Sequence, residues 1–468
     1  MLDPEILDPY VCLVKKLLAT RDMPGVSWIS QELSCDILPK AKWQTFVLRI
    51  ELTETNAKIN RKDDIRENRG FILAVLSFGH GVAHWFSESL PLMLPYIQAT
   101  MGFSTLQYGI LGAASGVTSG VVNIPGGILA DRLKRFWGLI LCVCMVWVAI
   151  SYAILGIAPS YPAMFIAVAI LGVPGTIWHL PATAALSQRF PDKRGFAVSM
   201  HGVGSNAGNF VGPVLTGALL GVMFWRSVAF VYIAPALLVA LMLWLTIMNI
   251  GVESPDDKSR TLREWFQNAM KMFKNPAVIG LVAVSLFRSG ALSTMTLWTP
   301  KYLGASVAEG GLEMSSFKVG LYFGFLAGMG FLSGPVLGLI SDKYGRKFVL
   351  VPGLIISALL PVLIVHVGSG IVLAIILIAA GLFTWSLHQI VLAAVLDVVG
   401  RGTEATAVGL VFAVVNMVGG ISPLIAAFII NHWSLGAIFY YVALLTGASA
   451  ILMILVPLKR YVPSTPRV

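Results

Sequence analysis

The segment Gly127-Ile-Leu-Ala-Asp131-Arg132-Leu-Lys134-Arg135 recurs 211 positions later as Gly338-Leu-Ile-Ser-Asp342-Lys343-Tyr-Gly345-Arg346-Lys347. Further matches at an offset of 210 or 211 are Ser104 with Ser315, Gly109 with Gly320, Ala197 with Ala407, Val198 with Val408, Asn206 with Asn416 and Pro213 with Pro423. One match alone is compatible with chance. Several at nearly one offset indicate that the chain contains two copies of one long unit.

The composition predicts that this duplicated unit lies in a membrane. Of the 468 residues, 57% are hydrophobic and 12% are charged, whereas soluble domains are about 25% charged. A span needs about 20 apolar residues. Runs of that length occur at 71–97, 107–131, 136–157, 161–187, 196–220, 225–250, 276–303, 317–341, 347–368, 370–397, 404–431 and 436–458. We therefore expect an all-α membrane protein with twelve transmembrane helices in two six-helix bundles.

The basic residues between these runs predict the orientation. If the N-terminus is cytoplasmic, 18 basic residues fall on the inner side and 3 on the outer side, as the positive-inside rule requires. We therefore expect both termini in the cytoplasm and a bacterial inner (plasma) membrane. The net charge of +10 then reflects topology, and no nucleic-acid partner is expected.

The first 70 residues differ from the rest, with 11 basic residues, 11 acidic residues and no spanning run. They are either a cytoplasmic extension that docks or regulates, or an over-long gene prediction with translation starting close to Arg69. The second alternative is favoured because the segment has no clear periodicity. The remaining chain divides into a first bundle at 71–250, a cytoplasmic linker at 251–275, a second bundle at 276–459 and a tail at 460–468.

The duplicated loop resembles the signature loop of the major facilitator superfamily, G-x-x-x-D-R/K-x-G-R-K/R, between helices 2 and 3 and again between helices 8 and 9. The second copy is complete, whereas the first has Lys134 in place of its glycine. The resemblance covers 71–468 and implies a cytoplasmic conformational latch. Its residues would be Gly127, Asp131, Arg132, Arg135, Gly338, Asp342, Lys343, Gly345, Arg346 and Lys347. The alternative is a loop that only determines topology.

A narrower resemblance is to the fosmidomycin-resistance branch of that superfamily. It rests on His84-Trp-Phe-Ser-Glu88 with Pro91 and Pro95, on Ile177-Trp178-His179-Leu180-Pro181, and on the segment from Arg194-Gly195 to Gly212-Pro213. Two positions depart from the branch. Glu88 replaces an aspartate, and Ala182 or Thr183 stands near the place of a glutamate. The substrate of the branch is therefore not carried over to this chain.

Ionisable side chains inside a membrane are costly and mark function by default. His80, His84 and Glu88 are spaced four residues apart, so they share one helix face along about 12 Å. Such a row can take up and release protons, because histidine changes charge near neutral pH. We predict that it couples transport to protons. The alternative is a ladder of hydrogen bonds that only fixes the helix to a neighbour.

Arg288 is the only basic residue deep within a predicted span. A guanidinium binds carboxylate or phosphate groups bidentately, so Arg288 predicts an anionic substrate. The alternative is an ion pair with Glu88. His179 and His388 occupy equivalent places in the two copies. The candidate residues of the substrate cavity are Arg288, His179, His388, Trp178, Trp385, Gln389, Asn206 and Asn416. His201 is interpreted as a packed histidine.

No Walker-type phosphate loop, no H-E-x-x-H and no C-x-x-C occurs, so no cofactor and no metal are expected, and an enzyme is disfavoured. The predicted function is secondary transport by alternating access, coupled to protons, of a small anionic or amphiphilic compound. Export is favoured because Gly208-x-x-x-Gly212-Pro213 resembles a motif of antiporters. Uptake of an organic acid by proton symport and a transporter-like solute sensor are the alternatives. Lipid, the small molecule and protons are the expected partners of a monomer.

Overall fold

The computed structural model describes residues 66, 68–248, 250–251, 263, 267, 270–384, 386–399 and 404–458, with the side chains of 131, 404–408 and 410 excepted. The predictions for the N-terminal 70 residues and the tail fall almost wholly outside the described residues, and most of the linker at 251–275 does too. Trp385 lies outside them too.

Each predicted span corresponds to a helix, or to two consecutive helices, whose ends differ from the prediction by at most four residues. The first bundle contains α3 (Arg69–Met101), α4 (Thr105–Arg132), α5 (Trp137–Ile157), α6 (Tyr161–Arg189), α7 (Arg194–Leu220), α8 (Trp225–Val231) and α9 (Ile233–Ile247). The second contains α11 (Pro276–Gly304), α12 (Ser316–Gly328), α13 (Gly330–Tyr344), α14 (Arg346–Val365), α15 (Ile371–Thr384), α16 (Ser386–Val398), α17 (Glu404–His432) and α18 (Ala437–Leu455).

Two of the helices, α4 and α11, begin at residues whose side chains cap them. Ser104 and Gln107 form a capping box at the start of α4, which satisfies backbone N–H groups that a helix leaves unpaired. Asn275 accepts a hydrogen bond from the backbone of Ala277 at the start of α11, and Pro276 follows it. Proline is favoured there because its missing N–H would have no partner. These caps place the first residues of α4 and α11 close to the starts of the two apolar runs.

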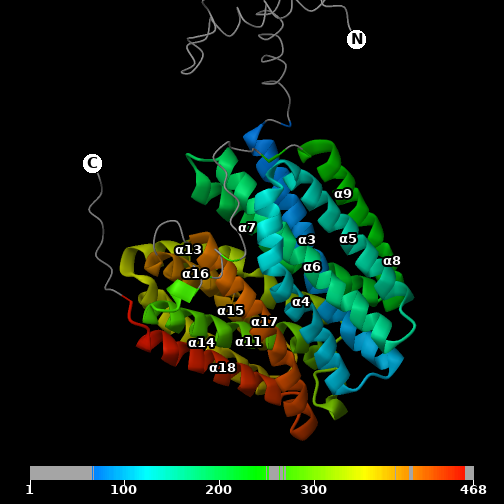
Figure 1. The fold of residues 1–468 in the computed structure, drawn as a ribbon. Helices are drawn as coiled ribbons and strands as arrows, with labels where there is room; N and C mark the ends of the chain where they lie inside the picture. The colour runs from blue at the N-terminus through cyan, green and yellow to red at the C-terminus, as the bar shows by residue number, and fades with distance from the viewer. Residues whose placement is uncertain are drawn as a thin grey trace, which may run out of the picture. The chain divides into compact units, whose positions relative to one another are not determined.

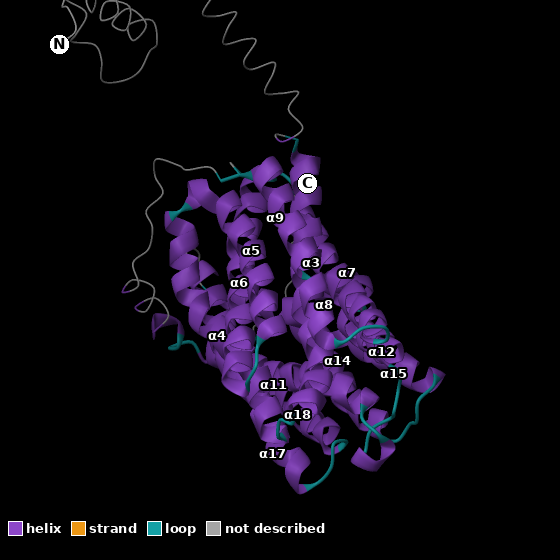
Figure 2. Ribbon diagram, turned by 90° about the vertical axis from the view of Figure 1, so that its right-hand side faces the viewer, coloured by secondary structure: helices purple, strands orange, loops and turns teal. Residues whose placement is uncertain are grey.

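The two bundles are visible as two groups of helices, α3 to α9 in blue to green and α11 to α18 in light green to red (Figure 1). Only helices and loops occur among the described residues (Figure 2). The most extensive contacts between the bundles join α4 with α17 and α7 with α12, and α3 also contacts α11. In the duplication α4 corresponds to α12 and α7 to α17, so the two extensive contacts are equivalent to each other.

Eleven of the described helical segments are long and apolar enough to cross a membrane. The exception is α7, because its six glycines, His201 and two asparagines lower its hydropathy. At 27 residues it is nevertheless about 40 Å long and exceeds the thickness of a bilayer core. It packs against α3 and α12, so protein rather than lipid surrounds its polar side chains. Twelve transmembrane helices are thus consistent with the described chain.

Glycines let α3 and α7 approach until their backbones touch. A methyl group on Gly208 would lie 1.9 Å from the carbonyl oxygen of Gly81, and one on Gly204 would lie 2.1 Å from that of Ser77. Such approach is available only to residues without a side chain, and it maximises van der Waals contact between membrane helices. The position of α7, and of the histidines that α3 presents to it, depends on this contact.

The same kind of contact joins the two bundles at two places. A methyl group on Gly116 of α4 would lie 3.0 Å from the Cα atom of Gly420 of α17. One on Gly217 of α7 would lie 2.9 Å from the Cα atom of Gly320 of α12. At both places backbone meets backbone across the boundary between the copies.

Candidate functional site

A cavity of about 740 Å³ lies between the bundles. Its walls come from α3, α4 and α6 of the first copy and from α16 and α17 of the second. The lining includes His84, Ser115, Asn123, His179, Phe412 and Asn416. Gly127 and Trp137 also line it, so the cavity extends from the middle of the bundle to the end that carries the signature loops. It has the size of a pocket for a small molecule.

Four histidine rings gather at one wall of this cavity. The ring of His80 stacks on that of His201 with 4.0 Å between the centroids and 11° between the planes. The rings of His84 and His179 lie 4.7 Å and 4.8 Å from that of His80, both edge-on. We call these four residues the histidine cluster. The predicted row on α3 is therefore joined by one histidine from α6 and one from α7.

Hydrogen bonds hold two of these rings in place. Nδ1 of His80 lies 2.9 Å from the carbonyl oxygen of His201, and Nδ1 of His84 lies 2.8 Å from Oδ1 of Asn209. Nε2 of His80 is buried and has no hydrogen-bond partner in the described chain. One ring nitrogen from each of His80, His84 and His179 lies within 4.8 Å of the others. The cluster thus brings ring nitrogens of three histidines close together, and the sequence did not predict the contribution of His179 to this group.

Glu88 lies one turn beyond His84 on α3 and is 6% exposed. Its Oε2 atom has no hydrogen-bond partner, and no basic side chain of the described chain lies within ion-pair distance. Glu88 is not among the residues that line the cavity. It is therefore a buried acid beside the cavity rather than part of its wall.

Arg288 of α11 is also buried, at 6% exposure. Its Nη1 donates to the carbonyl oxygen of Thr384 at 3.0 Å, and its Nη2 donates to Nδ1 of His388 at 2.8 Å. The alternative ion pair with Glu88 is wrong in this structure, because both of those acceptors lie in the second bundle. Among the described residues no carboxylate balances Arg288.

His388 connects Arg288 to the cavity. Its ring contacts the ring of Phe412, which lines the cavity, with 5.4 Å between the centroids. Arg288 is thus linked to the cavity wall through His388 and Phe412.

The other predicted cavity residues take several positions. Trp178 and Asn416 line the cavity. Asn206 instead donates to the carbonyl oxygen of Gly202 in its own helix at 3.0 Å. Gln389 is exposed, with its amide beside Gly202 of α7 and Gly334 of α13, and it is not part of the lining. Sequence position places a residue on a helix, but the rotation of the helix decides which space it enters.

The second signature loop forms a network of charges. Arg346 pairs with Asp342 at 2.5 Å and with Asp397 of α16 at 2.7 Å, and it donates to Oγ of Ser341 at 3.0 Å. Gly345 has a φ of 98°, a conformation that favours glycine. This network joins α13, α14 and α16 within the second bundle.

The first signature loop is built differently. Lys134 replaces the glycine and begins a short 3-10 helix, Lys134–Phe136, so no left-handed turn is needed there. Arg135 lies over the ring of Phe136, at 4.4 Å from its centroid. Arg132 is exposed, and the side chain of Asp131 lies outside the described residues. The remaining predicted latch residues Gly127 and Gly338 have open space where a side chain would begin, and Lys347 donates to the carbonyl oxygen of Ile454.

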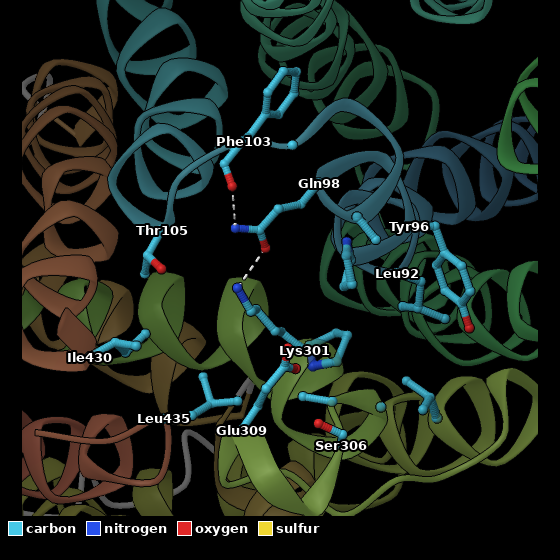
Figure 3. A pocket seen from close by; sticks show the side chains of 17 residues that line it. Leu92, Tyr96, Gln98, Phe103, Thr105, Lys301, Ser306, Glu309, Ile430 and Leu435 are labelled. Atoms are coloured by element: carbon cyan, nitrogen blue, oxygen red, sulfur yellow. Dashed lines mark hydrogen bonds between the residues drawn. The ribbon is translucent and has the colours of Figure 1, made fainter.

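Contacts between the bundles close the end opposite the signature loops. Lys301 of α11 donates to Oε1 of Gln98 of α3 at 2.5 Å, and Gln98 donates to the carbonyl oxygen of Phe103 at 2.9 Å (Figure 3). Tyr108 of α4 donates to the carbonyl oxygen of Leu297 at 3.1 Å. We call this group the seal. A second cavity of about 680 Å³, which Lys301 and Gln98 line, lies outside it.

Replacing Gln98 with alanine should weaken the seal. A hydrogen bond to a charged group contributes about 1.5 kcal/mol, so the population open at this end should rise roughly tenfold. The measurement is the rate at which a membrane-impermeant maleimide labels Ser115→Cys, in a background without other cysteines, from the face opposite the signature loops. Thr105→Ala, which alters the same cavity without crossing the bundles, is the control. Equal labelling rates in the two variants would contradict this role of Gln98.

Comparison with known proteins agrees with this architecture. The family model described as Major Facilitator Superfamily matches residues 76–337 and 303–467. The fosmidomycin resistance protein of Escherichia coli is 20% identical over 60% of this chain and 67% of its own length. The cis,cis-muconate transport protein of Acinetobacter baylyi is 22% identical over 74% of this chain and 84% of its own.

Among solved structures, a mutant of the nucleoside transporter NupG superposes with a TM-score of 0.71 at 15% identity, covering 83% of this chain and 100% of that one. At this identity the likeness concerns the fold. The family match spans both copies of the duplicated unit, and the predicted superfamily resemblance is thereby confirmed. This multi-pass membrane protein of twelve helices belongs to the Major Facilitator Superfamily and is a secondary transporter.

Proposed function

We propose that this chain exports a small anionic or amphiphilic compound in exchange for protons. It would work by alternating access in a bacterial inner membrane, with both termini in the cytoplasm. The cavity extends toward the signature loops, which the proposal places on the cytoplasmic side, and the proposal places the seal on the outer side. This arrangement suits loading from the cytoplasm.

Arg288 is the observation that carries the choice of an anion. A buried charge is costly unless it is paired, and the two acceptors of Arg288 are neutral. A carboxylate or phosphate group of the substrate would supply the missing negative charge. His388 and Phe412 connect this cation to the cavity, so a substrate that enters between the bundles can reach it after small movements.

Glu88 is the proposed proton carrier. The carboxyl group is buried, and its Oε2 atom lacks a hydrogen-bond partner. Binding a proton would remove the cost of a buried, unpaired negative charge. When the bundles rearrange and water reaches α3, the proton can leave. His84 and His80 both line the cavity. We predict that they transfer the proton between Glu88 and the cavity.

The signature loops would act as the latch. Arg346, Asp342 and Asp397 join helices of the second bundle at the end where the cavity opens. We propose that the first loop, with Asp131, Arg132 and Arg135, closes against its own bundle in a comparable way. The two loops would then favour one conformational state until substrate or proton changes the balance.

Proton-coupled uptake of an organic acid is the second candidate. The relative named for cis,cis-muconate favours it, because muconate is an organic anion that Arg288 would suit. The same residues would serve export and uptake. Only the measured directions of the proton flux and the compound flux distinguish the two candidates.

The test is proton flux in proteoliposomes that contain the purified full chain and an internal pH dye, against a panel of organic anions and drugs. Wild type should couple the movement of at least one compound to protons. Glu88→Gln should abolish the coupled proton flux, because an amide cannot carry the proton. Glu309→Gln, an acid at the sealed end, is the matched control and should transport as wild type does.

The possible outcomes separate the candidates. Opposite directions of proton and compound support export by antiport, and equal directions support uptake by symport. Coupled proton flux that persists in Glu88→Gln would overturn the role of Glu88. Binding of a compound without any flux would favour a sensor over a transporter.

A further inference from the structure

The histidine cluster combines features that neither proton transfer nor packing requires. Three residues from two helices bring ring nitrogens within 4.8 Å of one another. They range from buried His80 through half-buried His84 to exposed His179. His84 and His179 line the cavity. The group therefore has both a buried end and an entry path from solvent.

The hydrogen bonds determine which nitrogen of His80 is free. A carbonyl oxygen can only accept, so Nδ1 of His80 must donate its hydrogen to His201. In the neutral ring Nε2 then carries a lone pair, and this atom is buried without a partner. His84 is held through Nδ1 in a similar way by Asn209, which leaves its Nε2 available. A hydrogen bond from the other ring nitrogen to an oxygen is how proteins orient metal-binding histidines.

We propose that His80, His84 and His179 bind a divalent transition-metal ion of the zinc class. Zinc–nitrogen distances of about 2.0–2.1 Å in a tetrahedron place ligand nitrogens about 3.3 Å apart, so the rings need to move inward by about 1 Å. His84 and His179 border open space, which permits this movement. Imidazole ligands suit zinc, copper, nickel and cobalt, whereas magnesium and calcium prefer oxygen.

Three protein ligands leave the fourth position of a tetrahedral ion open toward the cavity, as in metal sites that bind a further molecule. No carboxylate of the described chain belongs to the three-histidine group. The bound ion would therefore keep its full positive charge beside the cavity. An anion that enters the cavity would be attracted to this charge. The proposal stands independently of proton coupling, because metal binding is measured without transport.

The first experiment measures binding of Zn²⁺ to the detergent-solubilised full chain, purified with a tag that contains no histidine. Equilibrium dialysis with elemental analysis should give one Zn²⁺ per chain. Co²⁺ should show the intense visible absorption bands of tetrahedral coordination. Asn209→Ala, which removes only the hydrogen bond that orients His84, should weaken Zn²⁺ binding by about 10- to 100-fold.

Variants locate the ion. His179→Gln and His80→Gln should each lose the stoichiometric Zn²⁺, and His432→Gln, a histidine at the exposed end of α17, should retain it. Thermal unfolding of each variant without metal identifies any that fail to fold. Wild type that binds no more Zn²⁺ than the triple variant at positions 80, 84 and 179 would overturn the proposal. A Co²⁺ complex of wild type without tetrahedral bands would also overturn it, and this second readout needs no variant to fold.

Discussion

Arg288→Ala is expected to lower the transport of an anionic compound on the order of 100-fold. Removing one partner of a buried charged pair costs about 2–5 kcal/mol, and each 1.4 kcal/mol is about a factor of ten in affinity. The loss should appear mainly as a higher concentration for half-maximal transport, because the guanidinium binds the substrate's charge. The measurement is the initial rate of uptake into vesicles at a series of substrate concentrations.

Two variants control this result. Arg288→Lys keeps the charge without the planar fork and should retain part of the activity. Arg226→Ala removes an arginine that donates to the carbonyl oxygen of Gly156 at 2.7 Å, away from the residues that line the cavity, and should transport normally. A normal rate in Arg288→Ala, with anions still preferred over neutral compounds, would show that another group binds the charge.

Gly208→Val is expected to destabilise the protein by about 3 kcal/mol. The first atom of any side chain at this position would lie 1.9 Å from the carbonyl oxygen of Gly81. That neighbour is backbone and cannot rotate away, so α3 and α7 must separate along their contact. The histidines that α3 presents to α7 would move with it. Thermal unfolding of the purified protein in detergent measures the effect.

Gly447→Val provides the matched control, because a methyl group at this position of α18 would have no atom within 4 Å. It introduces the same side chain into a transmembrane helix without a clash. Its unfolding temperature should stay near that of wild type. If the two valine variants unfold at the same temperature, close packing of α3 on α7 does not limit stability.

The fold was predictable because the bilayer imposes a length on every apolar run. Twelve runs in the sequence became helices with ends displaced by at most four residues, and the repeated loop identified the two copies. Even α7 was found, although its glycines and polar residues keep it below the hydropathy of a typical span. Its partners α3 and α12 pack against it and cover its polar residues.

The sequence predicted which site residues are neighbours within one helix, but not which residues of different helices meet. The spacing of His80 and His84 placed them on one face, but the approach of His179 and His201 depends on how α6 and α7 pack against α3. The pairing of Arg288 was likewise decided by helix rotation, which directed the guanidinium to His388 instead of Glu88. The H-x-x-x-H spacing on α3 was the one signal that hinted at metal-binding geometry, and the third ligand lies 95 residues away from His84.

The two glycine contacts between the bundles have a mechanical consequence. Gly116 meets Gly420, and Gly217 meets Gly320, in two helix pairs, α4 with α17 and α7 with α12, that are related by the duplication. Two points of contact define a line, and one body can roll against another about such a line. Because backbone meets backbone at both points, no side chain has to be withdrawn at these two points for the bundles to roll. The two contacts thus form an axis about which one bundle can rotate against the other. Ligands bound between the copies would then determine the direction of the rotation.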